Sequence, residues 1–404
     1  MLKAAPAEAI LASSLLRTEN STGHDHARSF EEPPFPSFKS KNLTWDLTLD
    51  VEKGLHPRQP AASPLSTDQK ITADEGSIFR PGTVIGFSRL RAAAPDGTSS
   101  GNEDEFVGEL PRHLLTSWLY RHGHSQPQPQ LQPKAKAYII HPQPCTIFSP
   151  QALLSSLLSQ SESQSNTSTY SKRPPPLNRN EAIPLLDSVT LYPVFDFKGA
   201  VDALSAVERE LHALAQNQAE QQSRTPQQRS ESEPEPEPET QSVLILAGLD
   251  TLTESIIRSS NAVRGAAVLG SLLRSVTRLS RSYSHTSLPL SVILVNLSGV
   301  GSSPHFSNLK SQHQGDIQAE TRDDGPTSTT TINSGAPQTI FSTSAPDTPL
   351  FPSLLMKSLD GETDTHLLVS RIGGGRVIEV VKDRTGEGTG RWCVWPEPKA
   401  KYMS

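Results

Sequence analysis

The sequence predicts an α/β fold with a mostly parallel central sheet, helices on both faces and an antiparallel meander at the C-terminal end. Strand-like and helix-like segments alternate along the chain, as in consecutive βαβ units. The segments 242–246 and 288–297 are almost continuously apolar, which is typical of parallel strands that are covered on both faces. Near the C-terminus, the β-prone runs 366–372, 376–381 and 391–395 are separated by turn residues, which indicates antiparallel pairing.

The individual elements follow from the spacing of the apolar residues. Residues 109–120, 198–215 and 262–282 carry apolar side chains at helical spacing, and another helix begins at residue 150 after a turn. Before the meander, strands are expected in the order 81–87, 137–141, 188–195, 242–246 and 288–297.

Composition favours a single domain of ordinary size. The 404 residues could hold two or three average domains, but only 34% of them are hydrophobic and 34 are Pro. We therefore expect a mostly disordered N-terminal region at 1–74 and one domain at 75–398. Disordered insertions are expected at about 159–180, 216–241 and 301–349, the second of which contains an acidic Glu-Pro run.

Charge and cysteine content exclude several classes of protein. The net charge of −6 does not indicate nucleic acid or an anionic membrane as a partner of the whole surface, so any such contact needs a local basic patch. Cys145 and Cys393 are far apart in apolar runs, which favours reduced thiols in a cytosolic or nuclear protein. No apolar stretch approaches the roughly 20 residues of a membrane span, and no membrane contact is expected.

Seven segments of the chain follow the order of a known family. They are 79–88, 138–158, 191–204, 243–252, 264–281, 291–301 and 376–395. Together, and above all through the stretch EVVKDRTGEGTGRWCVW at the C-terminal end, they resemble RecA-type recombinases and their paralogs in eukaryotic DNA repair. The resemblance implies a RecA-like, P-loop-type core from about residue 75 to residue 395.

The position of the phosphate loop in that family is degenerate in this chain. Such a loop needs Gly-rich backbone, a Lys for the phosphate charge and a Ser or Thr for Mg²⁺. The segment after the first strand holds Gly97 and Gly101, but no Lys-Ser or Lys-Thr pair follows. Instead, the acidic residues 103–105 would repel a triphosphate.

Two carboxylates that the resemblance implies are also missing. The second strand runs into His141 and Pro142 in place of a carboxylate that activates water. The Walker B strand ends in Ala247 and Gly248 in place of the Asp that holds the Mg²⁺ shell. Asp250 comes two residues late, and capping of the following helix is its favoured role. We therefore expect no catalytic residue and no cofactor, with binding of ATP and Mg²⁺ as the alternative.

Arginines are the candidates for contact with DNA. Arg258 and Arg264 lie near the segment that faces DNA in the resembled family, and Arg274, Arg278 and Arg281 form a stripe along one helix. Phosphate contact competes with a plain solvated helix face, which is favoured for the stripe. The absence of aromatic residues nearby counts against tight binding of single strands.

Three residues are candidates for docking of a partner. Phe197 and Ala200 fit the Phe-x-x-Ala pattern by which recombinase subunits bind one another, although core packing is favoured because they begin an internal helix. Of the tryptophans Trp392 and Trp395, one is expected in the core, and Trp395 is the candidate for an exposed anchor.

Other sites have little support. The histidine pairs 24/26 and 122/124 lack further ligands at metal-site spacing, so no metal is expected. No Gly-x-Ser-x-Gly elbow supports a Ser-His-Asp hydrolase.

The sequence thus favours a nuclear, non-catalytic, RecA-like accessory protein of homologous recombination or DNA repair. Its expected partners are recombinase or RecA-like paralog subunits and single-stranded or branched DNA. One alternative is a structural subunit of a RecA-fold assembly that serves tRNA modification, similar to the silent subunits of Elongator. The other is a DNA-dependent ATPase with an atypical nucleotide site.

Overall fold

A computed structural model describes most of the expected domain and little of the N-terminal region. The described residues are 79–90, 103–124, 136–143, 145–165, 177–224, 242–284, 288–300, 350, 353–372, 375–384, 386 and 388–395, together with 47, 50 and 339. Within the region expected to be mostly disordered, Leu47 and Asp50 are helical and buried, at 3% and 7% exposure. Leu47 belongs to the hydrophobic core.

The strands form one eight-stranded sheet in the order β3-β2-β4-β5-β1-β6-β7-β8. In chain order these are β1 (Val84–Leu90), β2 (Lys136–Pro142), β3 (Val189–Val194), β4 (Ser242–Ala247), β5 (Leu290–Val300), β6 (Thr365–Ile372), β7 (Gly375–Asp383) and β8 (Trp392–Trp395). All pairs from β3 to β6 are parallel, and β6, β7 and β8 pair antiparallel. The predicted α/β class, with a mostly parallel sheet and a C-terminal antiparallel meander, is confirmed.

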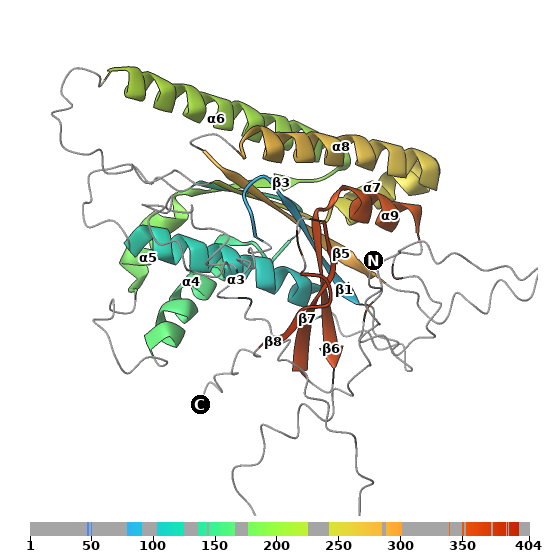
Figure 1. Cartoon of the computed structure of the whole chain (residues 1–404), viewed down its shortest axis with the longest axis horizontal. Coiled ribbons are helices and arrows are strands. Elements are labelled where there is room, and N and C mark those ends of the chain that lie inside the picture. Colours follow the sequence, from blue (N-terminus) through green and yellow to red (C-terminus); the bar gives the residue numbers. More distant parts are fainter. Residues whose placement is uncertain are drawn as a thin grey trace, which may run out of the picture.

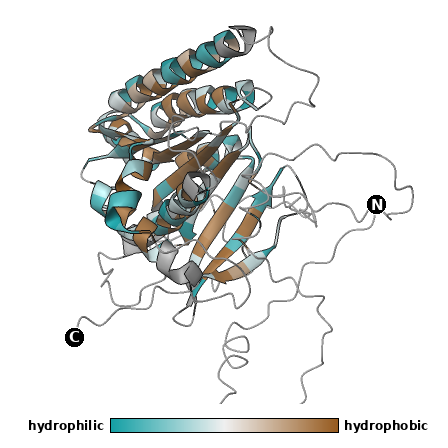
Figure 2. Cartoon of the chain, turned by 90° about the vertical axis from the view of Figure 1, so that its left-hand side faces the viewer, coloured by the Kyte–Doolittle hydropathy of each residue, from teal (hydrophilic) through white to brown (hydrophobic). Residues whose placement is uncertain are grey.

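Helices cover both faces of this sheet (Figure 1). One core layer packs α3 (Glu103–His124), α4 (Pro150–Ser165) and α5 (Arg179–Leu186) against the sheet. The other layer contains α6 (Phe197–Arg224), α7 (Leu249–Ser259), α8 (Ala262–Ser282) and α9 (Leu354–Glu362). Apolar residues concentrate in the strands and on the helix faces that meet them (Figure 2), so burial of these faces drives the layered packing.

Several helices extend beyond, or lie outside, the predicted ones. The sequence places the start of an insertion at residue 216, whereas α6 continues to Arg224, because Ala, Gln and Glu favour helix without any apolar face. In the same way α4 continues to Ser165 within the expected 159–180 insertion. The short helices α5 and α9 are not predicted, since fewer than ten residues carry too few apolar positions to establish a period.

Candidate functional site

The carboxyl ends of the parallel neighbours β4 and β5 lie side by side at one edge of the sheet. Gly248 is the N-cap of α7 and has a left-handed backbone, with φ 67°. Asp250 lies in the first turn of α7, is fully buried, and accepts a hydrogen bond at Oδ1 from the backbone N–H of Leu297 at 3.2 Å. The expected capping role of Asp250 is therefore wrong, because its carboxylate connects α7 to β5.

A row of buried polar side chains crosses the sheet beneath α9. Asn296 of β5 donates from Nδ2 to Ser88 Oγ of β1 at 2.7 Å, and Ser88 Oγ lies 2.8 Å from His366 Nε2 of β6. His366 Nδ1 lies 3.2 Å from Asp360 Oδ1. Lys382 Nζ of β7 lies 3.3 Å from Asp360 Oδ2 and also donates a hydrogen bond to the backbone carbonyl of Asp360. We refer to these five residues as the polar row.

Burial and the neighbouring charges shift the pKa values of the ionisable groups in the polar row. Complete burial lowers the pKa of His366, so the imidazole is neutral. Burial alone would raise the pKa of Asp360, but the hydrogen bond from His366 and the charge of Lys382 lower it. Burial also lowers the pKa of Lys382, which Asp360 partly opposes. Each contact is satisfied when Nδ1–H of His366 donates to Asp360 and Nε2 accepts from the Ser88 hydroxyl.

Ser88, His366 and Asp360 thus have the order of contacts found in Ser-His-Asp hydrolases. Ser88 and His366 are both completely buried, so no substrate reaches the hydroxyl. Sequence reasoning missed this arrangement, because residues from β1, α9 and β6 carry no shared local pattern. Its effect is structural, since it connects four strands and one helix through satisfied hydrogen bonds.

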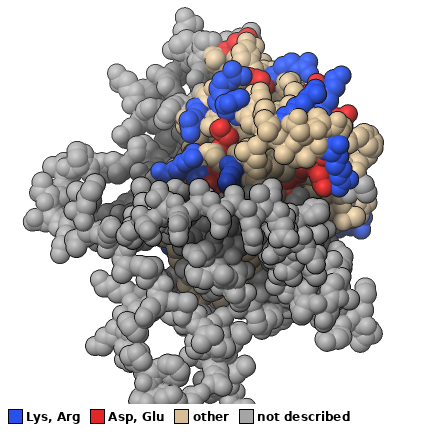
Figure 3. All heavy atoms as spheres, turned by 90° about the vertical axis from the view of Figure 1, so that its right-hand side faces the viewer, with Lys and Arg blue, Asp and Glu red and all other residues tan. Residues whose placement is uncertain are grey.

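The candidate DNA-contacting arginines lie in two separate places. Arg258 on α7 pairs with Glu254 at 2.7 Å, and Arg264 is exposed in the first turn of α8. Arg274 and Arg278 are exposed farther along α8. Lys and Arg outnumber acidic side chains on the visible upper part of the face in Figure 3. Because Arg264 and Arg278 are separated by about 20 Å of helix, the four arginines do not form one compact patch.

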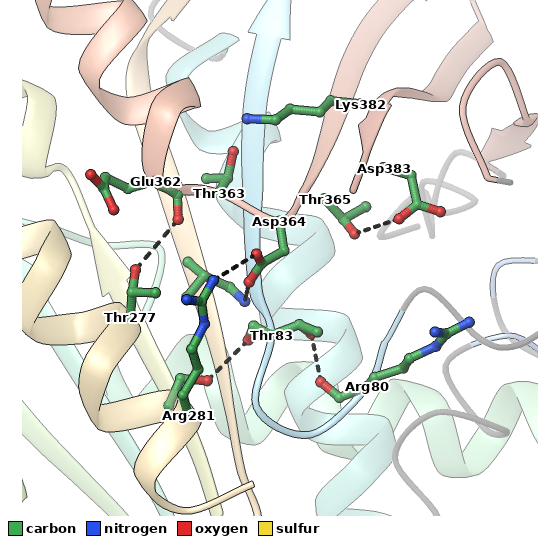
Figure 4. Close-up of polar contacts among 12 residues, drawn as sticks. Arg80, Thr83, Thr277, Arg281, Glu362, Thr363, Asp364, Thr365, Lys382 and Asp383 are labelled. Atoms are coloured by element: carbon green, nitrogen blue, oxygen red, sulfur yellow. Dashed lines mark hydrogen bonds and ion pairs between the residues drawn. The ribbon is translucent and has the colours of Figure 1, made fainter. Parts of the chain in front are cut away.

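Arg281, the last arginine on this helix, contacts Asp364, the residue just before β6 (Figure 4). Its Nη2 lies 3.4 Å from Asp364 Oδ1, while Asp364 Oδ2 accepts from the backbone N–H of Val84 at 2.9 Å. Nearby, Ser280 Oγ donates to the carbonyl of Thr83 at 3.3 Å. These contacts fix the C-terminal end of α8 on the amino ends of β1 and β6.

The docking candidates are placed mainly inside the fold. Phe197 and Ala200 are buried in the core between α6 and the sheet, in agreement with the packing interpretation. Trp395 is half-buried, and its ring meets His113 of α3 edge-on, with centroids 4.9 Å apart. Gly97 and Gly101 lie outside the described residues. Within the described part, no three His, Cys, Asp or Glu side chains gather as metal ligands.

A cavity of about 620 Å³ lies at the carboxyl ends of β2 and β3. Its lining is mainly apolar and includes Cys145, Phe148, Leu191 and Pro193. Phe195 contributes to the lining and is 82% exposed, the most exposed large apolar side chain in the described part of the chain. Sequence reasoning considered Phe197, which fits the Phe-x-x-Ala pattern and was expected in the core, and missed Phe195, because a single exposed side chain after a strand leaves no pattern.

No known protein-family model matches the chain, and no curated protein matches it in sequence. Among solved structures, the chain is similar to the crystal structure of the RadB recombinase, with 11% identity and a TM-score of 0.36. The match covers 78% of this chain and 86% of that chain. A likeness this weak concerns the fold at most and carries no argument about the site. None of the described helices has an apolar stretch long enough to cross a bilayer.

Proposed function

We propose that the chain is a RecA-like accessory protein of homologous recombination or DNA repair, which works in the nucleus by binding partners without hydrolysing ATP. The proposal is supported by the order of the sequence segments and by the surface around Phe195. Its partners are RecA-like recombinase or paralog subunits, with single-stranded or branched DNA as a second, electrostatic partner of Arg258 and Arg264.

The exposed Phe195 beside an apolar cavity is the observation that carries the partner-binding half. Phe195 follows β3, which lies at the edge of the sheet and pairs, among the described strands, with β2 alone. An edge strand offers free backbone groups to an added strand, and an aromatic side chain next to a cavity is typical of an interface anchor. Burial of one phenylalanine side chain contributes about 2–3 kcal/mol, which is about a quarter to a third of the roughly 8 kcal/mol of a micromolar affinity.

The side chains at the strand ends support the non-hydrolytic half. By the sequence resemblance, Ala247 and Gly248 stand where a Mg²⁺-binding carboxylate is expected, and the positive φ of Gly248 favours glycine there. The nearby Asp250 and Ser88 are buried and hydrogen-bonded within the fold. A carboxylate and a hydroxyl in these roles are not available to a metal–triphosphate complex.

Replacement of Phe195 by Asp is expected to abolish capture of RecA-fold partner subunits from nuclease-treated extract, while the variant remains folded. The aspartate lacks the apolar ring that anchors the partner, and its carboxylate would have to lose its water on binding, which weakens the affinity. Affinity capture followed by quantitative mass spectrometry measures the loss, which we expect to be at least about tenfold for an anchor worth 1.4 kcal/mol or more.

Val263→Asp is the matched control, because Val263 is also an exposed apolar residue, at 69%, but lies on α8. Equal capture by both variants would remove the support for the Phe195 surface. Subunits of a tRNA-modification complex as the lost partners would favour the alternative function instead.

Purified protein is expected to hydrolyse no ATP above a no-protein blank, and 1 mM ATP with Mg²⁺ is expected to leave its melting temperature unchanged. A ligand at 100 times its dissociation constant would stabilise by about 2.7 kcal/mol, which a thermal shift detects easily. Turnover that disappears in Asp250→Ala, with the variant still folded, would overturn the non-hydrolytic half and favour the atypical ATPase.

A further inference from the structure

The outward face of α8 carries positive charge and no negative charge. Its exposed positions include Arg264, Ser271, Arg274, Arg278 and Arg281, which fall on one side of the helix. The helix has 21 residues with the sequence AVRGAAVLGSLLRSVTRLSRS, which contains no Asp or Glu. We refer to Arg274, Arg278 and Arg281 as the arginine stripe.

The arginine stripe is only partly neutralised by the described residues. Arg281 makes the contact with Asp364 but keeps 63% of its side chain exposed. Arg274 and Arg278 are exposed and form no ion pair within the described part of the chain. Three like charges spaced along one helix face repel one another, so an anion on this face would be stabilising.

A long acidic run of the chain lies between α6 and β4. Residues 231–239 have the sequence ESEPEPEPE, with a Glu at every second position and no Lys or Arg. This stretch, which we refer to as the glutamate segment, lies outside the described residues. The described elements on either side of it are α6, which ends at Arg224, and β4, which begins at Ser242.

The described elements on both sides of the glutamate segment end at the edge of the sheet where α8 ends. The backbone N–H of Ser242 donates to the carbonyl of Pro289 at 2.9 Å, so the start of β4 lies beside the start of β5. The C-terminal end of α8 contacts the start of β1, which is the next strand after β5. In Figure 1 the C-terminal ends of α6 and α8 lie toward this same edge.

The lengths are compatible with direct contact. Neighbouring strands are about 4.8 Å apart, so the start of β4 lies about two strand spacings from the start of β1. The arginine stripe extends over about 10 Å of helix. A chain of eleven residues, from Glu231 to Ser242, spans at most about 35–40 Å, which is more than this path requires.

We propose that the glutamate segment binds the arginine stripe of the same chain. Carboxylate–guanidinium contacts are charge-assisted, and the short tether gives an effective concentration in the millimolar range. Because both partners are exposed, the contact weakens as salt screens the charges. The segment therefore competes with DNA or any other polyanion for Arg274 and Arg278, a regulation that does not depend on which protein partner the chain binds.

The test measures the reactivity of single arginines in the full-length protein. A dicarbonyl reagent modifies accessible guanidinium groups, and mass spectrometry gives the rate at each residue. The wild type is compared with a variant in which all five glutamates at 231, 233, 235, 237 and 239 are replaced by Gln, which keeps the length and the prolines. Arg179 on α5, exposed on the opposite layer, is the internal control.

At 50 mM salt, Arg274 and Arg278 are expected to react at least about threefold more slowly in the wild type than in the Gln variant, as for a tether whose effective concentration is about twice the dissociation constant. The difference should vanish at 1 M salt, and Arg179 should react equally in both proteins. Equal rates at low salt would overturn the proposal. Protection that is lost on dilution would assign the contact to a second copy of the chain. Protection that appears in both proteins only with added oligonucleotide would assign the arginine stripe to nucleic acid. Either result would also overturn the proposal.

Discussion

Replacement of Asp360 by Ala is expected to lower the free energy of unfolding by about 3 kcal/mol, because the change leaves a charge and a donor without their partner in the protein interior. Lys382 has only 13% of its side chain exposed, and His366 is fully buried. In the variant, the ammonium of Lys382 loses its counter-charge and keeps only backbone contact, while Nδ1–H of His366 loses its acceptor.

Urea denaturation followed by circular dichroism measures this effect, with Glu362→Ala as the matched control. Glu362 lies on the same helix, and the contact drawn for it uses its backbone carbonyl, which accepts from Thr277 and remains in the control (Figure 4). The control is expected to change stability by less than about 0.5 kcal/mol, as for an ordinary surface substitution. If Asp360→Ala were as mild as the control, the polar row would not contribute to stability.

Acidification from pH 7.5 to 5.0 is expected to destabilise the protein by about 2 kcal/mol through His113 alone. Burial, with a smaller contribution from Arg112, lowers the pKa of His113 from 6.5 to about 4. The unfolded chain therefore binds a proton below pH 6.5, whereas the folded chain binds it only near pH 4. Stability is full above pH 6.5 and falls as the pH drops through this window. Burial lowers the pKa of His366 as well, which adds to the loss in the same direction.

The pH dependence is measured by denaturation curves at several pH values, with His113→Gln compared with His212→Gln. The first variant removes the titrating ring at the Trp395 contact, and the second removes an exposed histidine of α6. The fall in stability should be about half as steep or less in His113→Gln and unchanged in His212→Gln. A slope that is the same in all three proteins would contradict the assignment to His113.

The layered architecture could be predicted from the sequence, whereas the contents of the site could not. The apolar runs of β4 and β5 and the amphipathic face of α8 are local patterns with a defined period, and they predict the sheet and its covering helix. Strand pairing over long separations leaves no such pattern. For this reason Asp250 was assigned to a helix cap, although its partner lies 47 residues away on β5.

The same limit applies to the exposed Phe195 and to the N-terminal region. The start of an amphipathic helix favours burial of Phe197, but no local pattern predicts that Phe195, two residues earlier, is exposed. Likewise, the expected disorder of residues 1–74 follows from composition, which does not show that Leu47 packs into the core. Side-chain direction and docking of distant segments are tertiary effects that a single sequence leaves undetermined.

The central place of β1 has a consequence for synthesis on the ribosome. This strand emerges early but lies between β5 and β6, and its contact between Val84 and Asp364 joins residues 280 positions apart. At 5–20 residues per second, translation needs roughly 15 to 60 seconds to deliver the second neighbour. During that interval a strand with at least one hydrogen-bonding edge unpaired must be kept from aggregating, so the nascent chain is expected to depend on chaperones until the meander has left the exit tunnel.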